Sequence, residues 1–347
     1  MSKSASNLAR GCLWLVLLLL ITLAVFGALY AFGIKSGLIY FIAVVAASWL
    51  VKQILRPKAE TDVIFRMRFR IIFILVMMIC FAVFLHKVGE HTATYSYDYS
   101  EENTVRADTL LVNEQAIPIW SSYRNWKDNN GKSYQGPLRV TQEDYLALQD
   151  IAATYQPAGN PRYFWGDLYA FLDNRSQVSL ALLYETFALI GDQQQLNQME
   201  FAQMVTSCIQ DIPYALVFQG VCQNVDQYED DNIRTVLQNC PDCCIGNKVF
   251  GIQAPAEFIA TLKGDCDTRT VLLYSVLKHF DYDVAILNSS YYRHSILGLN
   301  IPASGLYKVW RGKRYYVWET TSKYFRIGQL SANMDDLTHW EIVLNSK

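Results

Sequence analysis

Apolar positions are concentrated in three continuous runs near the N-terminus, at residues 11–33, 37–51 and 71–85. The first run has no charged residue over 23 positions, and each of the other two is 15 residues long. A helix needs about 20 apolar residues to cross a bilayer core of about 30 Å. One 15-residue run would also fit a buried helix, but three runs separated by short basic loops predict a membrane anchor of three transmembrane helices over residues 1–87.

The basic residues predict how this anchor is oriented. Lys and Arg are retained in cytoplasmic loops, and the loop at residues 52–70 holds six of the ten that occur before residue 88. The N-terminus, with Lys3 and Arg10, is expected on the same side. Three spans then place everything after residue 87 outside the cytoplasm. A cleaved signal peptide is not expected, because the first run lacks a small-residue cleavage site and further spans follow it.

Beyond the anchor, shorter patterns predict mixed secondary structure. Residues 88–140 are expected to form a linker and a small β region, with a hairpin turn at Asn130-Gly131. Thr141 and Asp144 resemble a helix-capping pair. Helices are predicted near residues 163–173, 177–190 and 196–210.

The last third of the chain changes from helical to alternating periodicity. Leu273, Val276, Leu277 and Phe280 fall on one face of a helix. Strands are predicted at residues 284–287, 294–301, 306–310 and 314–319. A helix followed by successive antiparallel strands indicates an α+β fold, with helices packed on an antiparallel sheet.

Charge changes the picture by excluding one class of partner. After residue 87 the chain carries 20 Lys and Arg against 30 Asp and Glu. Nucleic-acid binding requires a basic surface, so no nucleic-acid partner is expected. The three apolar runs hold almost no ionisable residues, so transport is not expected either. They are interpreted as an anchor in the lipid bilayer or as a surface that binds a membrane-protein partner.

Six of the eight cysteines lie beyond the anchor, where export would allow disulfides. If Cys266 is a free nucleophile, an odd number is left and at least one of these is unpaired: Cys208, Cys222, Cys240, Cys243 and Cys244. The spacing of Cys240 and Cys243 fits half a zinc site, a redox pair or a structural disulfide. No second such pair follows, which favours the disulfide. The acidic run at 226–231 offers cation ligands, but its spacing favours a solvated loop.

Candidate chemistry centres on Gly264-Asp265-Cys266-Asp267, directly before the predicted helix. Cys266 would lie in the first turn, where the helix dipole and unpaired N–H groups lower a thiol pKa and can face an oxyanion. Gly264 would leave room for a substrate backbone.

A nucleophilic thiol needs a base and an acid that orients the base. His294 is the candidate base, because the other histidines fall at the membrane edge, in the linker, at a helix end or near the chain end. Glu319, at the end of the last predicted strand, is the candidate acid. Each of these residues alone is more often structural, so the prediction depends on the three together.

Residues 210–328 resemble the core of the transglutaminase-like superfamily, whose members share a papain-type fold. The resemblance covers about 120 residues, about a third of the chain. It rests on Gln210-Asp-Ile-Pro-Tyr214, Pro255-Ala-Glu257-Phe258, Gly264-Asp-Cys-Asp267, the strand at 282–287, Tyr292-Arg-His294, Tyr315-Tyr-Val-Trp-Glu319-Thr-Thr321 and Ile327-Gly328.

The resemblance implies that Cys266 attacks an amide or acyl carbon and that His294 carries the proton. Glu319 stands where the family usually has Asp, and its longer side chain can still reach an imidazole. Gln210 sits where an upstream polar residue often helps to stabilise the oxyanion. Arg269 occupies a helix position that small residues often fill. No metal or other cofactor is implied.

These patterns lead to one hypothesis with an alternative. Residues 141–347 are expected to form a transglutaminase-like domain that acts as a membrane-anchored cysteine hydrolase or acyltransferase on peptide or protein amide bonds, through a thioester. The resemblance favours a bacterial inner membrane, with the N-terminus cytoplasmic and this domain periplasmic. The alternative is a catalytically inactive domain of the same fold that binds or scaffolds a partner, which a disulfide at Cys266 would favour.

Overall fold

The computed structural model describes residues 104–157 and 159–347. The three predicted membrane spans therefore lie outside the described residues. Within the described ranges, no helix is long and apolar enough to cross a bilayer. All described residues belong to one compact unit, so the β region before residue 141 packs with the rest of the domain and is not a separate module.

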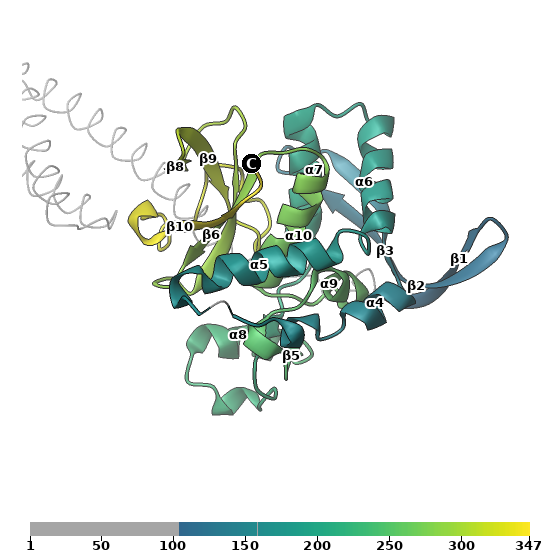
Figure 1. Ribbon diagram of the computed structural model, residues 1–347, viewed down its shortest axis with the longest axis horizontal. Helices are drawn as coiled ribbons and strands as arrows, with labels where there is room; N and C mark the ends of the chain where they lie inside the picture. The colour runs from purple at the N-terminus through teal and green to yellow at the C-terminus, as the bar shows by residue number, and fades with distance from the viewer. Residues whose placement is uncertain (1–103, 158) are drawn as a thin grey trace, which may run out of the picture. The chain divides into compact units, whose positions relative to one another are not determined.

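The first sheet has three antiparallel strands in the order β1-β2-β3. They span β1 (Arg106–Val112), β2 (Gln115–Lys127) and β3 (Ser133–Thr141). The predicted hairpin turn is confirmed, because Trp126 pairs with Tyr134 across it and the Asp128 carboxylate accepts the backbone N–H groups of Asn130 and Lys132. The β1–β2 hairpin projects from the body of the domain (Figure 1).

Helices follow this sheet and again precede the second one. They are α4 (Gln142–Leu148), α5 (Phe164–Ser176), α6 (Ala181–Gln193), α7 (Gln198–Asp211), α8 (Asp231–Asn239), α9 (Pro255–Thr261) and α10 (Cys266–His279). The predicted cap is confirmed at α4, where the Thr141 hydroxyl accepts the N–H of Asp144. The three helices predicted before residue 211 correspond to α5, α6 and α7, with ends shifted by one to four residues.

The second sheet has five strands in the order β10-β6-β7-β9-β8, all antiparallel to their neighbours. They span β6 (Val284–Ser289), β7 (His294–Leu299), β8 (Tyr307–Trp310), β9 (Lys313–Trp318) and β10 (Glu341–Asn345). The α+β prediction is therefore confirmed for the described chain. The edge strand β10 was not predicted.

Helix α10 is the centre of the fold. It packs on β6 and β7 on one side and on α5, α7 and α9 on the other. Every residue from Cys266 to Leu277 is buried except Asp267. The opposite face of the sheet is covered as well, by a smaller cluster around Leu287, Val317 and Trp340. The packing of α10 on β6 and β7 thereby fixes the positions of Cys266, the first residue of α10, and His294, the first residue of β7.

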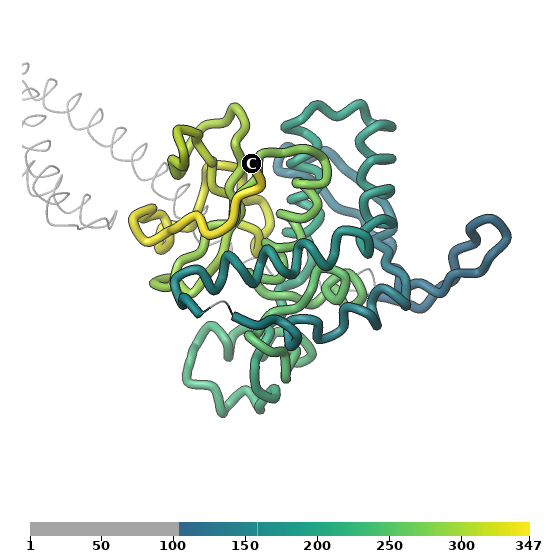
Figure 2. The backbone as a smooth tube through the Cα atoms, viewed as in Figure 1, coloured from purple at the N-terminus to yellow at the C-terminus, as the bar shows by residue number. Residues whose placement is uncertain are grey.

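A lobe at residues 216–251 is inserted between α7 and α9 and extends from the body as a separate loop of chain (Figures 1 and 2). It contains α8 and the short parallel pair β4 (Leu216–Val217) and β5 (Cys244–Ile245). Few of its side chains are buried, namely Val217, Leu237 and Cys243. Two disulfides, Cys222–Cys244 and Cys240–Cys243, hold it together.

Candidate active site

Cys266 is the first residue of α10, where the sequence placed it. The Asp265 carboxylate caps the helix by accepting the Thr268 N–H at 3.1 Å. Only 7% of Cys266 is exposed, and it is a free thiol. A Cβ on Gly264 would meet the Phe258 ring at 2.9 Å and the Thr268 methyl at 3.0 Å. The space beside Gly264 is thus filled by the protein itself, not kept for a substrate backbone as expected.

His294 opens β7 and lies between Cys266 and Glu319. Its Nε2 is 3.0 Å from Glu319 Oε2 and 3.2 Å from Oε1. Cys266 interacts electrostatically with this imidazole, because each group shifts the pKa of the other. Because the carboxylate occupies Nε2, the thiol is left with Nδ1. The structure therefore brings the three predicted residues together in the order thiol, imidazole, carboxylate, which is the order that nucleophilic catalysis requires.

Glu319 directly follows β9 and is 1% exposed. Its Oε1 accepts the backbone N–H groups of Thr320 and Thr321, each at 2.9 Å, and the Thr321 hydroxyl at 2.7 Å. Burial raises the pKa of this carboxyl, but His294 and the hydrogen bonds from Thr321 lower it by more. The resulting pKa is about 2. The carboxylate is ionised and held in one orientation.

The pKa values of the other two groups shift upward. Burial lowers the pKa of His294, but the Glu319 carboxylate and Cys266 raise it more, to well above its ordinary value. Burial and the neighbouring Asp267 raise the pKa of the Cys266 thiol, and His294 only partly offsets this. The expectation that the helix N-terminus alone would lower this pKa is wrong, because desolvation of the thiolate outweighs it.

The carboxyl groups beside Cys266 are tied into the fold. Asp267 accepts the Tyr169 hydroxyl at 2.6 Å, and Asn288 donates to that hydroxyl at 3.0 Å. Burial, followed by repulsion from Asp267, raises the pKa of Asp265 to about 7. Tyr169 of α5 and Asn288 of β6 thereby hold the Asp267 carboxyl in place next to the thiol.

Arg269 links the end of α7 and the residues after it to Gly264, two residues before Cys266, through hydrogen bonds. Its guanidinium is fully buried and donates to the backbone carbonyls of Ile209, Pro213 and Gly264 at 3.0, 2.5 and 2.8 Å. The Tyr214 ring lies 5.6 Å from the guanidinium carbon. The Ala215 N–H also donates to the Gly264 carbonyl.

Tyr214 is therefore a neighbour of Cys266 that the sequence did not single out. Burial, followed by Cys266 and Asp265, raises the pKa of its phenol well above the ordinary value, so the hydroxyl keeps its proton. No hydrogen bond within the described part of the chain occupies this hydroxyl. The signal was present in the sequence, since Tyr214 ends the first stretch of the family resemblance.

Gln210 is buried close to the site but faces the acid, not the thiol. Its amide nitrogen donates to the backbone carbonyls of Glu319, at 2.6 Å, and Phe325, at 3.1 Å. A primary amide has two N–H donors, and both are used. Gln210 therefore has no N–H donor left for the oxyanion role that was expected of it. Its hydrogen bonds instead support a role in positioning the Glu319 backbone.

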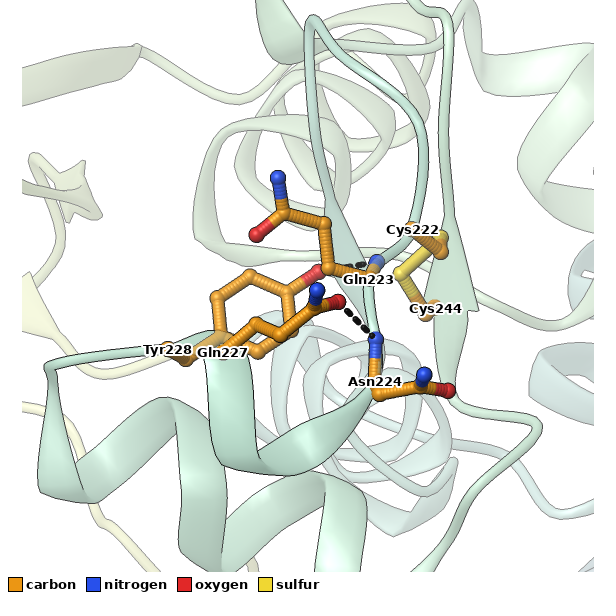
Figure 3. Close-up of a disulfide and its surroundings, with 6 residues drawn as sticks. All are labelled: Cys222, Gln223, Asn224, Gln227, Tyr228 and Cys244. Atoms are coloured by element: carbon orange, nitrogen blue, oxygen red, sulfur yellow. Dashed lines mark hydrogen bonds between the residues drawn. A yellow bond between two sulfur atoms is a disulfide. The ribbon is translucent and has the colours of Figure 1, made fainter.

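Four of the five remaining cysteines in the described chain form disulfides, which is the alternative that the spacing of Cys240 and Cys243 favoured. Cys240 and Cys243 are bonded to each other, as are Cys222 and Cys244, and Cys208 is free and buried. Beside the second bond, Tyr228 accepts the Gln223 N–H at 2.8 Å and Gln227 accepts the Asn224 N–H at 3.0 Å (Figure 3).

The cation and metal alternatives find no support in this part of the chain. In the acidic run, Asp230 caps α8 and Asp231 contacts Arg234. Among the residues that the structure describes, no group of His, Cys, Asp or Glu side chains is arranged to hold a metal. No protein-family model, curated protein or solved structure matches the chain.

Proposed function

We propose that the chain is a cysteine hydrolase or acyltransferase of transglutaminase-like, papain-type architecture that acts on amide bonds of peptides or proteins. One observation carries the proposal: His294 is close enough to Cys266 to lower the pKa of its thiol, and its Nε2 lies 3.0 Å from an ionised Glu319. A carboxylate on one nitrogen makes the imidazole a stronger base toward a group on the other nitrogen.

In the first step the neutral form of His294 takes the thiol proton on Nδ1, and the Cys266 sulfur attacks the amide carbon. The C–S bond forms while the carbonyl electrons move to oxygen. When they return, the C–N bond breaks and the nitrogen leaves with the proton from His294, giving a thioester and a free amine. Glu319 stabilises the imidazolium that exists between these two proton transfers.

Two donors are assigned to the oxyanion. The Cys266 N–H is the first of its helix and has no partner within the helix. The Tyr214 hydroxyl is the second. Donors placed where negative charge develops lower the barrier without reorganising in the reaction.

In the second step water, or an amine in a transfer reaction, attacks the thioester carbon after giving a proton to His294. The new C–O or C–N bond forms, the C–S bond breaks, and the sulfur recovers its proton. No cofactor enters this sequence.

The proposed setting is a bacterial inner membrane, with residues 1–87 as the anchor and the catalytic domain in the periplasm. The two disulfides support it, because disulfides persist in oxidising compartments. The six basic residues at 52–70 support a cytoplasmic loop between the second and third spans.

One observation favours the alternative of a non-catalytic binding domain: burial and Asp267 raise the pKa of Cys266. A thiolate is the nucleophilic form, so the two functions differ in whether His294 can take this proton near neutral pH.

Alkylation of the full-length chain with an iodoacetamide probe tests the proposal. Peptide mapping should locate the label on Cys266 at neutral pH, and Cys266→Ala should abolish it at that peptide. Cys208→Ala is the matched control, because burial raises the pKa of Cys208 to about 12 and this thiol should not react. An unlabelled Cys266 in the folded protein would contradict the proposal.

A further inference from the structure

A cavity of about 610 Å³ lies beside the turn end of the β2–β3 hairpin. This volume is within the range of about 300–1000 Å³ that small-ligand sites occupy. Its lining includes four primary amides, Asn125, Gln135, Gln193 and Gln194, together with Lys127 and Tyr324. Neither Cys266 nor His294 lines it.

The outward-facing side of the hairpin forms part of the cavity wall. Asn125 is paired with Gln135, and Lys127 with Ser133, on neighbouring strands, and all four are exposed. Three of the amides, Asn125, Gln135 and Gln193, make no side-chain hydrogen bond within the described ranges, and that of Gln194 to the Ser133 carbonyl is a long one, at 3.5 Å. The amide donors and acceptors are therefore open to a ligand.

Tyr324 contributes a ring on a firmly held loop. It is 52% exposed and has a φ of 67°, a conformation that non-glycine residues rarely adopt. The next carbonyl, of Phe325, accepts hydrogen bonds from Asn129, Gln210 and Trp318 at 2.9, 3.1 and 2.9 Å. Strained residues that the surrounding structure holds in place are concentrated at functional sites.

The cavity lining has two charged residues, Asp211 and Lys127, and they differ in whether an ion-pair partner already occupies them. Asp211 is already paired with Arg124 at 2.8 Å and with Lys323 at 2.6 Å. Lys127 is exposed and has no ion-pair partner within residues 104–157 and 159–347. The site therefore presents one free cation and no free anion among its charged lining residues.

These features define the ligand's chemistry. Amides both donate and accept hydrogen bonds, which suits hydroxyl and acetamido groups. The apolar lining residues Trp126 and Ile190 are 3% and 6% exposed, so the cavity lacks the open apolar anchor that a peptide side chain or a lipid would need. A flat exposed ring beside polar donors suits the face of a sugar.

We propose that this cavity binds an oligosaccharide that carries a carboxylate, with Tyr324 stacked on a sugar ring, the amides bonded to its hydroxyl and acetamido groups, and Lys127 paired with the carboxylate. The site does not depend on the chemistry at Cys266.

Two disaccharides that differ in one group test the proposal by titration calorimetry. N-acetylglucosaminyl-N-acetylmuramic acid has a carboxylate, and diacetylchitobiose has the same two rings without it. Both are titrated into the full-length Cys266→Ala chain, so that binding is measured without any reaction. The acidic disaccharide should bind with a Kd of about 1 mM or tighter, and the neutral one about tenfold more weakly.

Variants assign the binding to the cavity. Tyr324→Ala should weaken both sugars about tenfold or more, and Lys127→Ala should weaken only the acidic one. Tyr123→Ala, an exposed tyrosine of β2 that does not line the cavity, is the matched control and should change neither. No saturable binding of the acidic disaccharide, equal binding by the Tyr324→Ala chain, or saturable binding of trialanine in place of the sugars would overturn the proposal.

Discussion

The imidazole of His294, half-buried, and the buried carboxylate of Glu319 form a pair, with Nε2 and Oε2 3.0 Å apart. Glu319 reaches the ring from the position immediately after β9, and its other oxygen is held by Thr320 and Thr321. The pair fixes which nitrogen of His294 faces Cys266. Glu319 is therefore the carboxylate partner of this imidazole.

Glu319→Gln is expected to lower activity by about 10² to 10⁴-fold, because the amide cannot stabilise an imidazolium and can hold the wrong tautomer. The measurement is the rate of amide cleavage, or of Cys266 alkylation if no substrate is in hand. Glu185→Gln, an exposed carboxylate on α6, should leave the rate unchanged. Equal rates for both variants would show that the Glu319 carboxylate takes no part in the reaction.

The same pair predicts how stability changes in acid. The pKa of Glu319 is lowered from 4.5 to about 2 in the folded state, so its contribution is present above pH 4.5 and is lost as the pH falls toward 2. At about 1.4 kcal/mol per pKa unit this is on the order of 3 kcal/mol. For His294, whose pKa is raised, the contribution is present below its unfolded value of about 6.5 and is lost as the pH rises through its folded pKa.

Unfolding of wild type and Glu319→Gln, followed by tryptophan fluorescence in denaturant at a series of pH values, measures this contribution. The stability difference between the two chains should shrink between pH 4.5 and 2. A difference that is constant over this interval contradicts the assigned ion pair.

Tyr214→Phe is expected to lower kcat by about 10² to 10³-fold with little change in KM, because an oxyanion donor acts only when charge develops. Tyr163→Phe removes a hydroxyl from a largely exposed ring and should have no effect. A Tyr214→Phe chain that changes KM alone would make Tyr214 a substrate contact and not an oxyanion donor.

The two disulfides are expected to contribute unequally to the lobe at residues 216–251. Cys222 and Cys244 are separated by 22 residues, whereas Cys240 and Cys243 are separated by three. The loop-closure relation gives about 3 kcal/mol for the longer loop and about 1.5 kcal/mol for the shorter one.

Hydrogen exchange over the lobe measures this difference. The Cys222→Ser/Cys244→Ser pair should exchange faster than the Cys240→Ser/Cys243→Ser pair, because this lobe buries few side chains of its own. The reverse order would mean that packing around the shorter bridge, and not loop closure, stabilises the lobe.

Local patterns were sufficient for much of the fold. The cap at Thr141, the hairpin at Asn130-Gly131 and the position of Cys266 at a helix start depend on neighbouring residues, and each was predicted. Strand β10 was not predicted, because its partner β6 lies more than fifty residues earlier in the chain. Pairing over that separation leaves no local signal.

The electrostatics of the site required the tertiary structure. The pattern around α10 predicted one apolar face, whereas Thr270, Ser275 and Arg269 are fully buried as well. Their polar groups are paired inside the fold, Arg269 with three backbone carbonyls. The same burial raises the pKa of Cys266, against the expectation from the helix end alone. The trio could be predicted from residue type and order, but the pKa shifts could not.

The most direct test of the central claim is the pH dependence of Cys266 alkylation in the wild type and in His294→Ala. If His294 takes the thiol proton, the wild-type chain should react at lower pH than the variant, because removing His294 leaves burial and Asp267 to raise the thiol pKa unopposed. A clear displacement of the variant's profile toward alkaline pH is the predicted result. Superimposable profiles would contradict the account, because His294 would then have no influence on the proton of Cys266.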